Sequence, residues 1–263
     1  MEIQSINYNS HTVRYFRFGN PDGQPFVIIA GVAVRSVMES AEFIRQQYIS
    51  FEKDYNVYVI DRRTDVYDGY DINDMADDII HVLDSLSVRN ADIYGVSQGG
   101  MIAQSIAVNR PDVVRRLVLC STGAYVNDSA LEVMNKWREF AENHDAEKLM
   151  LSFAENVYTP AYCEKYHNAF IKLGELLTEK ELDRFSIIVK CTDKFDIRSK
   201  LNCIQCPILV IAAENDRIFG TEPSENIAEL TGGELYIYKN EAHGVYDENA
   251  DVLLRIKNFL DKN

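Results

Sequence analysis

Ser97 is flanked by glycines in a pattern typical of a nucleophile in acyl chemistry. It lies in residues 91–103, ADIYGVSQGGMIA, where a short apolar run is followed by glycines and then by helix-forming residues. A serine attacks an acyl carbon only if its hydroxyl stands clear of the backbone, and a sharp strand-to-helix turn presents it in this way. Gly95 and Gly99 leave room for that turn. The pattern therefore predicts a nucleophile elbow.

A nucleophilic serine needs a base, and the base needs a carboxylate that orients it. Of the five histidines, His243 follows a late predicted strand and precedes a glycine, so a loop can aim its imidazole at the carboxyl edge of a sheet. We predict that His243 is the base. The other four are interpreted as surface or packing residues: His11, His81, His144 and His167.

The predicted acid follows an apolar strand over residues 208–212. Asp216 is the first choice, Glu214 the reserve and Asp247 a weaker third candidate. Capping the next helix or pairing with Arg217 is the structural alternative for a carboxylate at this position. The chain order Ser97, Asp216, His243 is the order expected downstream of such an elbow.

Apolar runs alternate with helical patterns on both sides of the elbow, which predicts a parallel sheet covered on both faces. The predicted strands are 2–8, 12–18, 26–30, 57–60, the elbow strand, 116–120, 207–212 and 234–238; the first two form a hairpin whose turn is Asn9-Ser10-His11. Helices are predicted at residues 38–51, 223–230 and 252–260. Another helix is capped by Asp71 and carries an apolar stripe from Ile72 to Leu86, and the elbow helix ends near Asn109.

Residues 123–195 break this alternation. Four consecutive helices are predicted, at 130–143, 146–157, 161–173 and 179–192, with no strand among them. We expect an insertion after the sixth strand. It is rich in aromatic residues, most of which we interpret as its own core, with a few facing the serine.

Composition excludes several classes of function. With 27 Lys and Arg against 41 Asp and Glu, the net charge is −14, which argues against nucleic-acid and anionic-membrane partners. The amino terminus has no signal-peptide pattern and no apolar run approaches membrane-spanning length, so we expect a cytoplasmic protein.

The five cysteines are scattered along the sequence. The spacing of Cys203 and Cys206 is compatible with a redox or metal site, but no second cysteine pair completes a metal site, and buried thiols are the simpler interpretation.

The chain resembles an alpha/beta-hydrolase fold protein with a helical cap, through the elbow at residues 95–99, the strand-end acid at 214–216 and the late Ala242-His243-Gly244. The resemblance covers essentially the whole length. It implies a mostly parallel eight-stranded sheet flanked by helices, with residues 1–122 and 196–263 as the core and 123–195 as the cap.

The resemblance also implies an oxyanion hole, formed by the backbone N–H groups of Val32 and Gln98. Two segments depart from the family pattern: Ala30-Gly31 stands where the family often has His-Gly, and residues 61–64, Asp-Arg-Arg-Thr, stand where it often has Asp-x-Arg-Gly. Backbone donors do not require the missing histidine. A serine at position 97 excludes the relatives that use an aspartate nucleophile, such as haloalkane dehalogenases and most epoxide hydrolases.

These observations predict a serine hydrolase that cleaves a small or medium ester, thioester or amide through an acyl-enzyme. No cofactor is implied, because the phosphate-loop, dinucleotide-binding and His-Glu-x-x-His motifs are absent from the sequence. Hydrolysis of carbon–carbon bonds and aminopeptidase activity remain open alternatives. A ligand-binding or signalling protein with a slow or single-turnover triad is the alternative from another class, since a fold does not determine function.

Overall fold

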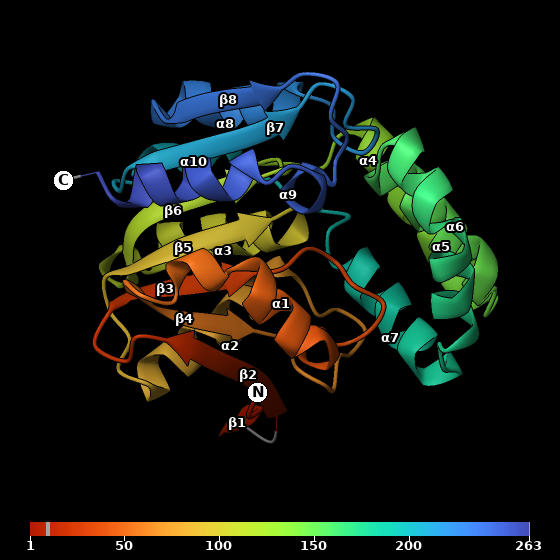
Figure 1. The fold of residues 1–263 in the computed structure, drawn as a ribbon, viewed down its shortest axis with the longest axis horizontal. Helices are drawn as coiled ribbons and strands as arrows, with labels where there is room; N and C mark the ends of the chain where they lie inside the picture. The colour runs from red at the N-terminus through yellow and green to blue at the C-terminus, as the bar shows by residue number, and fades with distance from the viewer. Residues whose placement is uncertain (9–10, 263) are drawn as a thin grey trace.

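The computed structural model describes residues 1–8 and 11–262 and contains a sheet of eight strands (Figure 1). The spatial order is β1-β2-β4-β3-β5-β6-β7-β8; β2 is antiparallel to both β1 and β4, and the remaining neighbours are parallel. The predicted fold class is confirmed. The strands are β1 (Gln4–Tyr8), β2 (His11–Gly19), β3 (Gln24–Ile29), β4 (Tyr55–Ile60), β5 (Ala91–Val96), β6 (Val114–Cys120), β7 (Ile208–Ala213) and β8 (Glu234–Tyr238).

Continuous apolar runs form the central strands because the sheet is buried on both faces. β4, β5 and β7 are buried along their whole length. Successive side chains point to opposite faces, so Phe26 and Ile28 of β3 join one core cluster, whereas Val27 and Ile29 join the other. Two apolar cores therefore lie back to back across the sheet.

Helices cover both faces (Figure 1). α1 (Ala41–Gln47) and α10 (Asp251–Leu260) pack on one face, and α2 (Ile72–Ser85), α3 (Gln98–Asn109) and α8 (Glu222–Thr231) pack on the other. A carboxylate in the first turn completes the predicted cap of α2: Asp71 accepts from the amides of Asn73 and Asp74, and the Asp74 side chain accepts from the Asp71 amide.

Between β6 and β7 the chain forms four helices in succession, close to the predicted ranges. They are α4 (Asp128–Glu142), α5 (Ala146–Val157), α6 (Pro160–Glu175) and α7 (Glu179–Lys190). Figure 1 shows them, in green to teal, beside the end of the sheet toward which the parallel strands point. Trp137 and Phe185 are buried inside this group, and Trp137 packs on Phe153 with ring centroids 4.8 Å apart. Part of the aromatic content is therefore helix–helix core.

The single helix predicted over residues 38–51 is wrong. The segment instead forms a short 3-10 helix (Val37–Ser40), α1 and a second short 3-10 helix (Ile49–Phe51). The breaks fall at Ser40, the last residue of the first piece, and at Tyr48, between the other two; their φ angles of −104° and −101° depart from the helical region. The hairpin turn residues Asn9 and Ser10 lie outside the described residues, and His11 begins β2 rather than belonging to the turn.

No helix in the described part of the chain combines the length and the apolar character needed to cross a membrane.

A buried ion pair fastens α2 to the segment that follows β4. The guanidinium of Arg63 contacts the Asp78 carboxylate through two nitrogens, and the Tyr70 hydroxyl donates to the same carboxylate at 2.7 Å. The side chains of Arg63 and Asp78 are only 7% and 1% exposed. Because water reaches neither group, each charge depends on the other for its stabilisation.

We expect Asp78→Ala to lower the free energy of unfolding by about 3–5 kcal/mol, because Arg63 is left as an uncompensated buried cation. Urea denaturation followed by circular dichroism measures the change. Asp77→Ala is the matched control, since Asp77 lies next in sequence on the exposed side of α2 and its loss should be nearly neutral. Equal effects of the two substitutions would contradict this assignment.

Candidate active site

Ser97 occupies the sharp turn between β5 and α3. Its backbone has φ 51° and ψ −121°, a conformation that residues other than glycine rarely adopt. The turn packs directly against β3: a Cβ atom on Gly99 would overlap the carbonyl oxygens of Ile29 and Ala30. Only glycine at position 99 permits this approach. The local geometry is that of the elbow expected from the sequence.

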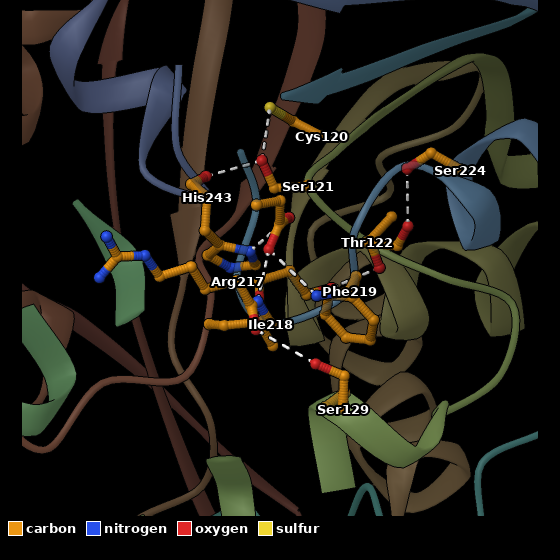
Figure 2. A network of polar contacts seen from close by, with 12 residues as sticks. Cys120, Ser121, Thr122, Ser129, Arg217, Ile218, Phe219, Ser224 and His243 are labelled. Atoms are coloured by element: carbon orange, nitrogen blue, oxygen red, sulfur yellow. Dashed lines mark hydrogen bonds and ion pairs between the residues drawn. The ribbon is translucent and has the colours of Figure 1, made fainter. Parts of the chain in front are cut away.

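Asp216 and His243 form a buried pair at the carboxyl edge of the sheet. His243 Nδ1 and Asp216 Oδ2 are 2.8 Å apart, and the two side chains are 2% and 1% exposed. The second carboxylate oxygen, Oδ1, accepts hydrogen bonds from the amides of Ile218 at 2.8 Å and Phe219 at 3.0 Å. These amides hold the carboxylate in place, and the Phe219 ring stacks on the imidazole with centroids 5.9 Å apart (Figure 2).

Backbone contacts hold the serine and histidine segments at one edge. The Ser97 amide donates to Cys120 O at 2.9 Å, at the end of β6. The next residue, Ser121, donates through its hydroxyl to His243 O at 2.7 Å (Figure 2). On the other side, the Gly244 amide donates to Val157 O at 2.6 Å, at the end of α5. Within residues 1–8 and 11–262 no hydrogen bond joins Ser97 Oγ to His243; such contacts are often long before substrate binds.

The other candidate acids lie elsewhere. Glu214 accepts a hydrogen bond from the Asn240 amide at 3.3 Å. Asp247 accepts from side chains of other elements and does not contact the imidazole. The structure therefore pairs His243 with Asp216 rather than with either reserve.

The other four histidines do not contact the Asp216–His243 pair in the described part of the chain. His11 is 2.6 Å from Asp65, and His144 is 2.8 Å from Asp183. His81 stacks on the Tyr8 ring, and His167 lies on α6.

Val32 and Gln98 are the residues expected to supply oxyanion donors. Gln98 is the first residue of α3, so its amide belongs to the helix N-terminus, where N–H groups lack intrahelical acceptors. Val32 follows Gly31, where an added Cβ would lie 3.3 Å from Ser97 Cβ. Among the described residues neither the Val32 amide nor the Gln98 amide has an acceptor, which leaves both free to bind a ligand oxygen.

Arg62 is a buried residue beside the candidate site that sequence reasoning missed. Its guanidinium donates to Ala30 O at 2.8 Å and to Gln98 Oε1 at 2.9 Å; the Gln98 amide nitrogen in turn donates to Ile188 O of α7 at 2.8 Å. Burial lowers the pKa of Arg62 to about 10, so it stays charged at neutral pH. The only sequence signal was the departure at residues 61–64 from the family pattern.

A cavity of about 460 Å³ adjoins the serine. Gly31, Val32 and Val96, the neighbours of Ser97 in space or sequence, form part of its wall; Ser97 and His243 themselves do not. The opposite wall comes from α5 and α6, through residues such as Phe153 and Phe170. A volume of this size suits a small-molecule ligand.

The cysteine pair does not form a metal site in the described residues. Cys203 and Cys206 are both free, and no group of three or more His, Cys, Asp or Glu side chains there is arranged to hold a metal ion. Cys203 is exposed and Cys206 is half-buried, so the expectation of buried thiols holds fully for neither.

The sequence matches a family model described as the alpha/beta hydrolase fold over residues 50–250. Among characterised proteins, 3-oxoadipate enol-lactonase 2 of Acinetobacter baylyi is 23% identical over 211 residues, covering 78% of this chain and 76% of that protein. A protein described as a putative carbamate hydrolase from Rhizobium rhizogenes is 23% identical over 242 residues, covering 86% and 87%.

Solved structures share the fold along the whole chain. An alpha/beta hydrolase enzyme from a Medee basin deep-sea metagenome library superposes with a TM-score of 0.89 at 20% identity, covering 99% of this chain and 98% of its own. The enol-lactonase from Burkholderia xenovorans superposes with a TM-score of 0.85 at 19% identity, covering 98% and 100%.

We expect Ser97→Gly to be more stable than Ser97→Ala by about 1 kcal/mol, because both variants lack the hydroxyl but only glycine relieves the strained backbone. Thermal and urea unfolding measure the difference. The control pair is Lys172→Gly and Lys172→Ala on the exposed side of α6, where glycine should be less stable by about 1 kcal/mol. The same sign at both positions would show that position 97 is not strained.

Proposed function

The chain belongs to the alpha/beta hydrolase fold family, and we propose that it is a cofactor-independent serine hydrolase cleaving a small or medium ester, thioester or amide. The observation that carries the proposal is the buried Asp216–His243 pair at the sheet edge that also presents Ser97. Acyl hydrolysis is the chemistry for which a serine, an imidazole and a carboxylate in these roles are suited.

In the proposed reaction, Ser97 Oγ attacks the carbonyl carbon while His243 Nε2 takes the hydroxyl proton. Asp216 holds Nδ1, which leaves Nε2 directed away from the carboxylate, and stabilises the imidazolium that forms. The tetrahedral intermediate collapses as His243 returns the proton to the leaving group. Water, deprotonated by the same imidazole, then attacks the acyl-enzyme and releases the acid.

The amides of Val32 and Gln98 are the proposed donors to the oxyanion. Their support is positional: Gln98 follows Ser97, Val32 follows Gly31, which packs against Ser97, and neither amide has another acceptor in the described part of the chain. Arg62 supports the same region indirectly, because it holds Ala30 O and the Gln98 side chain together. A charge that develops on the carbonyl oxygen is then met by donors already in position.

We further propose that residues 1–122 and 196–263 form the catalytic core and that 123–195 form a cap that selects the substrate. Support comes from α5 and α6, which supply one wall of the cavity, whereas the loop after β3 supplies the other. Differences among relatives in the cap would then change the substrate without changing the chemistry.

We expect one fluorophosphonate to react with the wild-type protein at Ser97, because the activated hydroxyl attacks phosphorus, fluoride leaves, and the phosphonylated serine does not turn over. Intact-mass spectrometry should show no adduct on Ser97→Ala or His243→Ala. Ser105→Ala is the matched control: this buried serine lies on α3, away from the pair, and its variant should label normally. Labelling of Ser97→Ala would exclude Ser97 as nucleophile.

Turnover separates an enzyme from a binding protein. We expect many cycles of hydrolysis per molecule on p-nitrophenyl esters of short acids, with kcat reduced about 10⁴-fold or more in Ser97→Ala and about 10⁴-fold in Asp216→Asn. Release of a single equivalent of p-nitrophenol, with no further cycles, would instead support a protein that traps its ligand.

A further inference from the structure

One carboxylate faces the cavity without a charged partner. Asp247 lies on the short helix α9 (Val245–Glu248), just after the histidine loop, and lines the cavity wall. Its Oδ1 accepts a hydrogen bond from Gln47 Nε2 at 3.1 Å, and its Oδ2 accepts one from the Tyr158 hydroxyl at 3.0 Å. Both donors are neutral, so they orient the carboxylate without balancing its charge.

The cation on the cavity wall is already paired. Arg35 contacts both Glu39 and Glu181, the latter at 3.2 Å. Among the described residues no Lys, Arg or His nitrogen lies within 4.0 Å of Asp247. The wall therefore carries an excess of negative charge, and that excess is located at Asp247.

The surroundings of Asp247 are unfavourable for a lone anion. Asp247 is exposed on the open cavity, so water reaches the carboxylate, but the protein atoms around it partly desolvate it and, with the neighbouring Glu248 charge, raise its pKa. A cation bound beside it would remove this electrostatic cost. The two neutral donors to Asp247 and the lack of a paired cation among the described residues both favour a cationic ligand.

Aromatic rings make up much of the same cavity. The faces of such rings carry negative charge and attract cations, above all alkylammonium groups. The rings are contributed by α1, the segment following it, α5, α6 and α9, and they belong to Phe43, Tyr48, Phe153, Tyr158, Phe170 and Tyr246.

We propose that this cavity binds an alkylammonium group of the substrate, with Asp247 as its anionic anchor and the aromatic rings as its walls. The inference rests on the proposed function and narrows it to esters, thioesters or amides that carry an aliphatic amine. Asp247 acts in specificity and not in the chemical step, since His243 is paired with Asp216.

The preference for a cationic substrate can be tested with pairs of esters that differ only in one atom, a charged nitrogen or a neutral carbon. Butyrylcholine and 3,3-dimethylbutyl butyrate carry nitrogen or carbon in the leaving group; 4-(trimethylammonio)butanoyl and 5,5-dimethylhexanoyl p-nitrophenyl esters carry the same difference in the acyl group. We expect the wild type to have a kcat/KM about tenfold or more higher for the cationic member of at least one pair. Equal rates or a preference for the neutral member in both pairs would overturn the proposal, and this result needs no variant.

Substitution at Asp247 assigns the preference to this residue. Asp247→Asn should reduce the cationic preference about tenfold, whereas Asp247→Glu, which keeps the charge, should retain most of it. Glu229→Gln is the control for net charge, because Glu229 is an exposed residue of α8 outside the cavity. An unchanged preference in folded Asp247→Asn, as judged by its circular dichroism, would remove Asp247 from the site.

The failure of the proposed function is distinguishable from the failure of this inference. If neither ester of any pair is hydrolysed and Ser97 does not label, the hydrolase proposal fails. Calorimetric titration with butyltrimethylammonium then tests the cavity directly: binding that weakens at least fivefold in Asp247→Asn supports the site, and equal or undetectable binding to both proteins overturns it.

Discussion

The position of the serine depends on how closely the turn after β5 approaches β3. A side chain at Gly99 would collide with two carbonyl oxygens of that strand, and one at Gly95 would collide with the first turn of α3. The turn therefore packs closely against β3 and α3, and within it Ser97 has a positive φ. The strained backbone of Ser97 is thus offset by the packing of the turn against β3 and α3.

A second constraint is the burial of Asp216 beside His243. A carboxylate removed from water needs hydrogen-bonding partners, and here two backbone amides and the imidazole provide them. The amides come from the turn after β7, and the imidazole from the loop after β8. The parallel arrangement of these strands brings the two turns to the same edge.

The helices between β6 and β7 are tied to this edge by specific contacts. Gln98 reaches α7 through Ile188 O, and the loop of His243 reaches the end of α5 through Val157 O. Gln98 and Gly244, the residues next to Ser97 and His243, are therefore hydrogen-bonded to the group of helices that shapes the cavity. A change in the packing of these helices would alter both the cavity and the positions of the groups beside it.

The sequence by itself determined the strand order along the chain, the turn at Ser97 and the four-helix segment, because apolar periodicity and glycine spacing are local properties. It named Glu214, Asp216 and Asp247 as possible acids. Only the tertiary structure shows which of them contacts the imidazole: the turn amides hold Asp216 beside His243, while Asp247 lines the cavity. The role of the buried arginine after β4 and the choice of cavity-lining rings were likewise beyond the sequence, because contacts between distant segments depend on how each helix is rotated against its neighbours.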